Sequence, residues 1–291
     1  MSRRLGVVLV TTAALCWSSG GLIARLVGTD PWTTIFWRSV FCAAFLSGAV
    51  ILIQRGRLGA VVREAGWPGL GMAACFATAS TAFIMALSRT SVANTLIIQT
   101  LSPFIAGLLG WLCLREHVRR RTWLAMAVAL VGTVVMLGGS PGGGSRVGDA
   151  LAFVTATAFA GATVLVRWHR TVYMPAAAAL AAALAGFFAF AQASPGSASG
   201  ADLALLALFG VGQLGVGMLC FTAGARLIPV AEASLIGVLE CVLGPIWVWL
   251  AIGERPSAFA MIGGAIILTA LVAHTLADLA RSRGPALGEM A

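Results

Sequence analysis

The chain has 291 residues, of which 59% are hydrophobic and only 10% are charged. Soluble proteins carry about a quarter charged residues, so this composition excludes an ordinary soluble domain and indicates a membrane protein. The formal net charge is +9, and all 19 basic residues that contribute to it are arginine. Most of these arginines lie in short loops between apolar spans, where they indicate membrane topology and not a partner such as nucleic acid.

A helix needs about 20 residues to cross the hydrocarbon core of a bilayer. Ten apolar segments approach that length, in chain order 5–27, 32–54, 66–87, 91–114, 122–137, 147–168, 175–193, 203–227, 230–252 and 257–279. The fifth and seventh are short. The basic start of the chain resembles a signal peptide, but its apolar run continues for a full span without a typical cleavage site. The sequence therefore predicts an all-α integral membrane protein with ten transmembrane helices.

Arginine placement predicts the orientation of these helices. With the N-terminus inside, fourteen loop arginines fall on the inner side, whereas Arg89, Arg146 and Arg255 fall on the outer side. Cytoplasmic loops carry an excess of basic residues, so both termini are expected to be cytoplasmic. We expect the cell inner membrane as the location, with residues 281–291 as a disordered cytoplasmic tail.

The chain also repeats itself. Residues 83–103 align without a gap with residues 221–241, at an offset of 138 positions, so each half contains five spans. Because five is odd, the second half enters the membrane from the opposite side. The sequence thus predicts two inverted five-helix repeats, residues 1–140 and 141–280, an architecture of secondary transporters that bind substrate near the midplane. Chance similarity between apolar segments is the alternative.

Two carboxylates lie inside the ninth span. Glu232 and Glu240 are eight residues apart, so on one continuous helix they share a broad face, roughly 12 Å from first to last. An ionisable side chain at bilayer depth costs at least ~2.5 kcal/mol and indicates a functional site. We expect Glu240 to bind substrate and, because burial favours a neutral carboxyl group, to couple transport to protons. Glu232 is a second candidate for proton coupling. The alternative, a protonated glutamate bonded to a neighbouring helix, is favoured for Glu232 near the start of the span.

Other polar or aromatic side chains lie deep in the first, second and fourth spans. The candidates for substrate binding are Trp17, Arg38, Asn94, Gln99 and Ser102, and weaker candidates in the third and eighth spans are Ser80, Thr81, Gln213 and Thr222. Trp17 offers an aromatic wall for rings or cations, or else packs in the core or against lipid. Arg38 is either a ligand for a carboxylate or a strut between helices. The polar seam of the fourth span either lines a pathway or joins helices by hydrogen bonds.

These segments resemble a known family. The run LSPFIAGLLGWLCLRE ending at Glu116 and the run GVLECVLGPIWVWLAIGE ending at Glu254 resemble the paired helices of the EamA family, in the drug/metabolite transporter superfamily. The resemblance implies ten helices around a central cavity that moves small metabolites such as amino acids by alternating access. The sequence departs from the family pattern at Cys241, where the family often has proline, and Pro245 is expected to supply the kink instead.

Function is predicted from this combination. The leading hypothesis is export of amino acids or related small metabolites, and the alternative is efflux of aromatic or quaternary-ammonium compounds. The sequence contains no Walker loop, GxSxG elbow, HExxH or Cys/His metal spacing, so we expect no enzyme activity, metal or cofactor. A membrane scaffold or an integral-membrane enzyme is a further alternative of another class; the lack of a sizeable soluble domain argues against the scaffold, and the lack of catalytic spacing argues against the enzyme. The expected partners are a small-molecule substrate and the lipid bilayer, and His274 is expected to be solvated.

Overall fold

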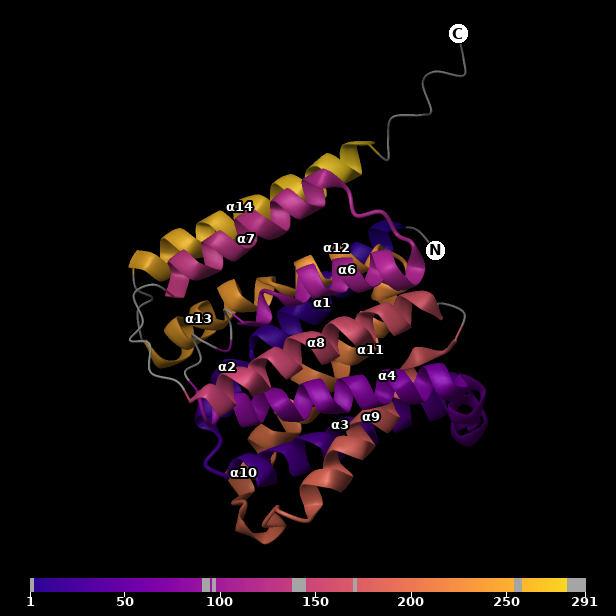
Figure 1. Cartoon of the computed structure of the whole chain (residues 1–291). Helices are drawn as coiled ribbons and strands as arrows, with labels where there is room; N and C mark the ends of the chain where they lie inside the picture. Colours follow the sequence, from indigo (N-terminus) through magenta and orange to yellow (C-terminus); the bar gives the residue numbers. More distant parts are fainter. Residues whose placement is uncertain are drawn as a thin grey trace.

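A computed structural model describes residues 3–90, 95, 98–137, 145–169, 172–253 and 258–281 (Figure 1). The regular elements of these ranges are all helical, which confirms the predicted all-α class. They are α1 (Arg3–Ser18), α2 (Gly20–Leu26), α3 (Pro31–Ile53), α4 (Leu58–Leu87), α6 (Ser102–Leu114), α7 (Arg120–Leu137), α8 (Arg146–Trp168), α9 (Met174–Phe190), η1 (Pro195–Ser197), α10 (Gly200–Ala207), η2 (Leu208–Gly215), α11 (Val216–Ala225), α12 (Val230–Gly237), α13 (Leu239–Ile252) and α14 (Ala258–Arg281).

Several of these helices are suited to a bilayer. Within the described ranges, six segments are long and apolar enough to cross a membrane, namely Arg3–Leu26, Pro31–Ile53, Leu58–Leu87, Arg146–Trp168, Gly200–Ala225 and Val230–Ala251. Three shorter apolar helices are Ser102–Leu114, Met174–Phe190 and Met261–His274. The predicted count of ten and the cytoplasmic orientation stay predictions. Asn94, the link around Ser140 and residues 282–291 of the expected tail lie outside the described residues.

The packing partners of the two halves correspond. The sequence repeat relates α1 to α8, α4 to α11, and α6 to α13. In the structure α1 packs against α11 just as α8 packs against α4, and α13 packs against α1 just as α6 packs against α8. Each equivalent contact joins one half to the other, so the core of the bundle is built by both.

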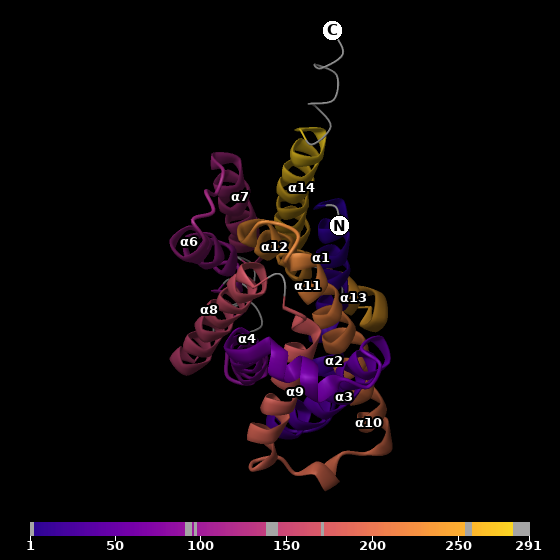
Figure 2. The same cartoon turned by 90° about the vertical axis from the view of Figure 1, so that its right-hand side faces the viewer.

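Helices α7 and α14 form a separate pair at one side of the bundle, which Figures 1 and 2 show from two directions. They pack closely, since a Cβ atom added to Gly132 of α7 would lie 2.9 Å from the carbonyl oxygen of Gly263 on α14. In Figure 1, α7 runs away from the end that holds the start of α1, and α14 runs back toward it. We call that end the terminal end. The inverted relation of the complete halves stays a prediction.

Three predicted spans are interrupted or extended in the structure. The first span divides into α1 and α2, where the hydroxyls of Ser18 and Ser19 donate to the carbonyl oxygens of Leu15 and Cys16. The expected loop after α3 is partly helical, because α4 begins at Leu58 and bends at Gly66, whose φ of 54° suits a residue without Cβ.

The ninth span is also divided. Helix α12 ends at Gly237 and α13 begins at Leu239, with Val238 between them. There the backbone N–H of Val238 donates to Leu235 O and that of Cys241 to Val238 O, both at the tighter i−3 spacing. Helix α13 continues through Pro245, and the kink expected at that residue stays a prediction.

Candidate functional site

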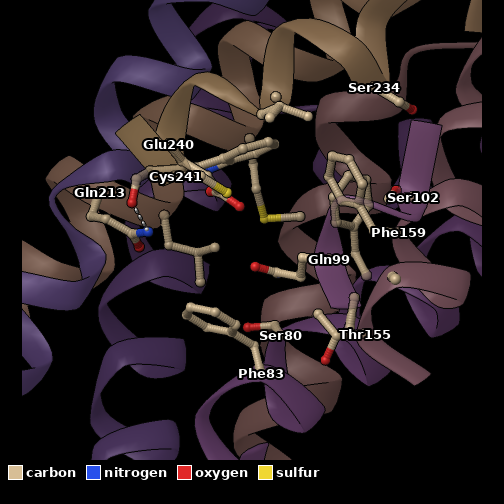
Figure 3. A pocket seen from close by; sticks show the side chains of 18 of the residues that line it. Ser80, Phe83, Gln99, Ser102, Thr155, Phe159, Gln213, Ser234, Glu240 and Cys241 are labelled. Carbon is tan, nitrogen blue, oxygen red and sulfur yellow. Dashed lines mark hydrogen bonds between the residues drawn. The ribbon is translucent and has the colours of Figure 1, made fainter. Parts of the chain in front are cut away.

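A cavity of about 120 Å³ lies in the core that both halves build. The wall of the cavity is formed by side chains of helices α1, α3, α4, α6, α8, α11, α12 and α13, of the segment η2 and of the residues just before α6. Figure 3 shows Glu240 and Cys241 on one side of this space and Ser102 and Phe159 on the other, with Gln99 reaching toward its middle. Of the six predicted substrate-binding residues, Trp17, Arg38, Gln99, Ser102 and Glu240 line this one cavity.

Trp17 forms an aromatic wall of the cavity. Its ring centroid lies 5.6 Å from that of Phe159 and 5.1 Å from that of Phe221. Phe76 packs edge-on against both phenylalanines. Because α1 ends at Ser18, directly after Trp17, the indole lies at a break in the helix. Its Nε1 is buried and has no hydrogen-bond partner in the part of the chain that the structure describes. The wall is therefore apolar and rich in π faces, with one unused donor.

Arg38 approaches the cavity from α3 and is only 2% exposed. One terminal nitrogen donates to the carbonyl oxygen of Ser80 at 3.3 Å and also to its Oγ. The guanidinium lies 4.8 Å from the ring centroid of Phe209, in cation–π geometry. No residue of the described ranges accepts a hydrogen bond from its Nε. Arg38 thus joins α3 to α4 while keeping one buried donor unused.

Gln213 is brought to the cavity by the π-helical segment η2. A π turn adds a residue to the helical turn and changes the direction of the side chains that follow, and it is common at functional sites. Gln213 Nε2 donates to the carbonyl oxygen of Trp17 at 3.2 Å, drawn as a dashed line in Figure 3. Its Oε1 is buried and accepts no hydrogen bond from the residues that the structure describes. The amide therefore fixes the end of α1 and leaves an acceptor unused.

Glu240 lies in the first turn of α13, directly after the interruption at Val238. Among the described residues, no basic side chain lies within the 4.0 Å ion-pair distance of its carboxylate, including Arg38 of the same cavity. The acidic and the basic group are therefore both available to one bound molecule.

Small polar side chains complete the wall. Gln99 Oε1, Ser102 Oγ and Ser234 Oγ are buried and have no hydrogen-bond partner among the described residues. Ser102 and Glu240 are equivalent positions of the sequence repeat, and both stand in the first turn of a helix, α6 and α13 respectively. Since buried polar groups are nearly always paired, several unpaired ones around one cavity indicate a site for a polar ligand or water.

Glu232 is not part of this cavity. It lies in the first turn of α12 and forms an ion pair of 2.7 Å with Arg3. Close by, Glu116 Oε1 pairs with Arg167 Nε at 2.7 Å, and Glu116 Oε2 accepts from the backbone N–H of Val230 at 3.3 Å. These contacts tie both halves together at the terminal end. The division of the ninth span thus assigns Glu232 and Glu240 to different sites.

Comparison with known proteins agrees with this architecture. A family model described as the EamA-like transporter family matches residues 4–138 and matches again over residues 146–275. The chain belongs to the EamA-like transporter family. The two matches mark two EamA repeats and confirm the resemblance inferred from the helix-pair motifs. The protein is accordingly a multi-pass membrane protein of a transporter family.

A solved crystal structure, described only as "Crystal structure of protein", matches this EamA chain with a TM-score of 0.77. The identity is 24% over 97% of this chain and 99% of the other, which shows a common fold. A comparison with curated protein sequences finds no match.

Sequence reasoning ranked some cavity residues of this EamA protein too low. Ser80 and Gln213 were weaker predictions, and Phe76, Thr155 and Ser234 were not predicted. A polar residue inside an apolar span is the available signal for Ser80, Gln213, Thr155 and Ser234. Phe76 has no such signal, because a phenylalanine in a membrane helix is equally suited to lipid. Among the described residues, no group of three His, Cys, Asp or Glu side chains is close enough to hold a metal ion.

Proposed function

We propose that this EamA protein is a secondary transporter of the inner membrane that exports amino acids or related small metabolites by alternating access. The observation that carries the proposal is the central cavity, where Arg38 and Glu240 share one space without forming an ion pair. A zwitterion with a carboxylate and an ammonium group suits such a pair of opposite charges.

The remaining wall suits the rest of such a substrate. The unpaired atoms of Gln99, Ser102 and Gln213 can exchange hydrogen bonds with a polar molecule and would otherwise stay unsatisfied or hold water. The rings of Trp17 and Phe159 offer an apolar surface for a side chain. The proposed ligand is therefore small, zwitterionic and partly apolar.

The ion pairs of the terminal end support a role in gating. Arg3–Glu232 joins α1 to α12, and Arg167–Glu116 joins α8 to the segment that follows α6. The cavity lies farther along the bundle from that end. In alternating access one end must close while the other opens. We propose that these pairs hold the terminal, cytoplasmic end closed and that they part when this end opens.

Efflux of aromatic or quaternary-ammonium cations is the second candidate, and a specific observation favours it. Within the described ranges the Glu240 carboxylate has no basic partner, and the indole of Trp17 with its neighbouring phenylalanines resembles the aromatic surroundings that stabilise cations. In this alternative Arg38 acts only as the strut between α3 and α4.

A transport assay separates the two candidates. The full chain is reconstituted into proteoliposomes, and uptake is measured for an amino acid, for the amine formed by its decarboxylation and for a quaternary ammonium compound, with and without a pH gradient. We expect saturable transport of the amino acid, competed weakly by the matched amine. Preferential transport of the cations would favour the second candidate. Absence of transport of every member of the panel, with correctly inserted protein, would contradict both.

A further inference from the structure

Three membrane spans are interrupted beside the central cavity, and the interruptions lie against one another. The first span divides between α1 and α2, the eighth contains the π-helical segment η2, and the ninth divides between α12 and α13. From this arrangement we infer that the three interruptions form one joint, about which α2, α10 and α13 bend relative to α1, α11 and α12. The inference rests on the proposed transport function, since this bending opens and closes the cavity at the end opposite the terminal end.

Two side chains connect the interruption of the first span to the other two. Gln213 of η2 donates from Nε2 to the carbonyl oxygen of Trp17 at 3.2 Å. Trp247 of α13 donates from Nε1 to the hydroxyl of Ser18 at 2.7 Å. Helix α13 also passes close to this point, because a Cβ atom added to Gly244 would lie 3.7 Å from the carbonyl oxygen of Ser18. All three contacts fall on two consecutive residues, so a bend in one span moves the others.

The segments on the two sides of the joint have different neighbours. Helix α1 packs against α11 and α12. Helix α2 instead contributes Ile23, which is only 5% exposed, to an apolar cluster with Ile35 of α3 and Phe209 of η2. After α2, the backbone N–H of Gly28 donates to Asp202 of α10 at 2.9 Å. In Figure 1, α2, α10 and α13 lie farther from the terminal end than α1, α11 and α12, so each side is held together by its own contacts.

Gly21 is the observation that indicates bending and not a fixed kink. Its φ lies outside the left-handed region, and no heavy atom of a described neighbouring segment lies within 4 Å of the position that a Cβ atom would take. Alanine would therefore fit, although glycine inside a helix costs ~0.5–1 kcal/mol relative to alanine. Neither close packing nor backbone geometry requires glycine here, which leaves flexibility as its physical role.

Ser19 weakens the helix at the same place. Its hydroxyl donates to the carbonyl oxygen of Cys16 at 2.8 Å, and its backbone N–H donates to the same oxygen at the tighter i−3 spacing. A hydroxyl that bonds back to the preceding turn bends a helix, and consecutive Ser and Gly residues are common positions of kinks. The first span thus has local reasons to bend where the three interruptions meet.

The cavity has residues on both sides of the joint. Trp17 stands near the end of α1, whereas Glu240 lies in the first turn of α13, after the interruption at Val238. Both line the cavity, so a ligand that contacts both favours one angle of the joint. Of the described residues that hold the joint, Ser18 and Trp247 lie outside the cavity wall. They are positioning residues that act through Trp17 and the joint.

Backbone hydrogen exchange tests the joint without a known substrate. The full chain in lipid nanodiscs is measured by mass spectrometry, and we expect the amides of residues 19–23 to exchange faster than those around Val10 of α1. Gly21→Ala should slow exchange of residues 19–23 roughly two- to fivefold, because the alanine helix is more stable by ~0.5–1 kcal/mol, and should keep or raise the melting temperature. Trp247→Phe keeps a ring but loses the bond to Ser18, so it should speed the same exchange by about fivefold.

Transport measures the consequence of the joint. In proteoliposomes Gly21→Ala should lower the transport rate roughly two- to fivefold, with an apparent affinity within about twofold of the parent. The matched control is Gly48→Ala in the continuous helix α3, where an added Cβ also meets no described neighbour, and it should change neither exchange of residues 19–23 nor transport. Ser19→Ala removes the bond back to Cys16, should act in the same direction as Gly21→Ala, and decides the result if Gly21→Ala melts early.

Two results would overturn the joint. One is exchange of residues 19–23 in the parent that is as slow as exchange around Val10. The other is parental exchange and parental transport in both Gly21→Ala and Ser19→Ala. If the parent transports no substrate, the proposed function fails, and the exchange rates still decide whether the joint exists.

Discussion

Replacing Arg38 by methionine tests whether this residue recognises the substrate or only supports the helices. The change keeps an unbranched side chain of similar length but removes the charge and every donor. If Arg38 binds a substrate carboxylate, the variant loses a charged hydrogen bond worth ~1.5–3 kcal/mol, which is roughly a 10- to 150-fold loss of apparent affinity. The stability cost should be smaller, because methionine leaves no buried unpaired donor, only Ser80 loses a hydrogen-bond partner, and the methionine side chain can still pack against the ring of Phe209.

The assay compares two substrates in the same proteoliposomes. We expect Arg38→Met to lose transport of an amino acid while competition by the decarboxylated amine stays within about twofold of the parent. Arg38→Lys keeps the charge but not the planar fork of donors, so its transport of the amino acid should lie between that of the parent and that of Arg38→Met. An equal loss for both substrates, together with a lower melting temperature, would refute the recognition role and leave Arg38 as a strut.

Three further predictions concern the cavity and the terminal end. Glu240→Gln preserves the shape of the side chain and removes its titration, so accumulation driven by a pH gradient should be lost while exchange of substrate persists; parental accumulation would exclude Glu240 as the coupling group. Gly217→Ala would bring a Cβ within 2.6 Å of Trp17 Cδ1, so the indole must move into the cavity and transport should fall at a stability cost of ~1–3 kcal/mol; unchanged transport would show that the position of Trp17 is unimportant. Glu116→Gln weakens the ion pair at the terminal end and should speed labelling of Cys241 by a water-soluble maleimide, measured by peptide mapping; labelling at the parental rate would contradict a gating role.

The sequence by itself predicted the class of the protein and the depth of its polar residues. A chain with so few charged residues does not have enough of them for a surface that faces water. Charged side chains such as Arg38 and Glu240 stand out inside apolar spans, because inserting them into a bilayer is costly. The internal repeat and the helix-pair motifs also predicted the family. These properties are local or periodic along the chain, so they can be read without coordinates.

Helix continuity was less accessible from the sequence. Glu232 and Glu240 were expected on one helix face, but the interruption at Val238 separates them into an ion pair at the terminal end and a cavity wall. The proline that suggested a kink lies two turns beyond the observed break. Whether an apolar helix bends depends on which hydrogen bonds its neighbours and its own tighter turns can replace, and the sequence of that helix alone does not contain this information.

Only the tertiary structure decided which faces of the helices pack against each other. Apolar periodicity distinguishes buried from wet surface in a soluble protein, but in a membrane both the lipid face and the packed face are apolar. The sequence therefore could not assign Phe76 to the cavity, and it placed His274 in water, although this residue is only 7% exposed. Pairs such as Arg3 with Glu232 are 229 positions apart in the chain. Their contact exists because the two halves fold against each other, and that packing follows from the shapes of all the helices together.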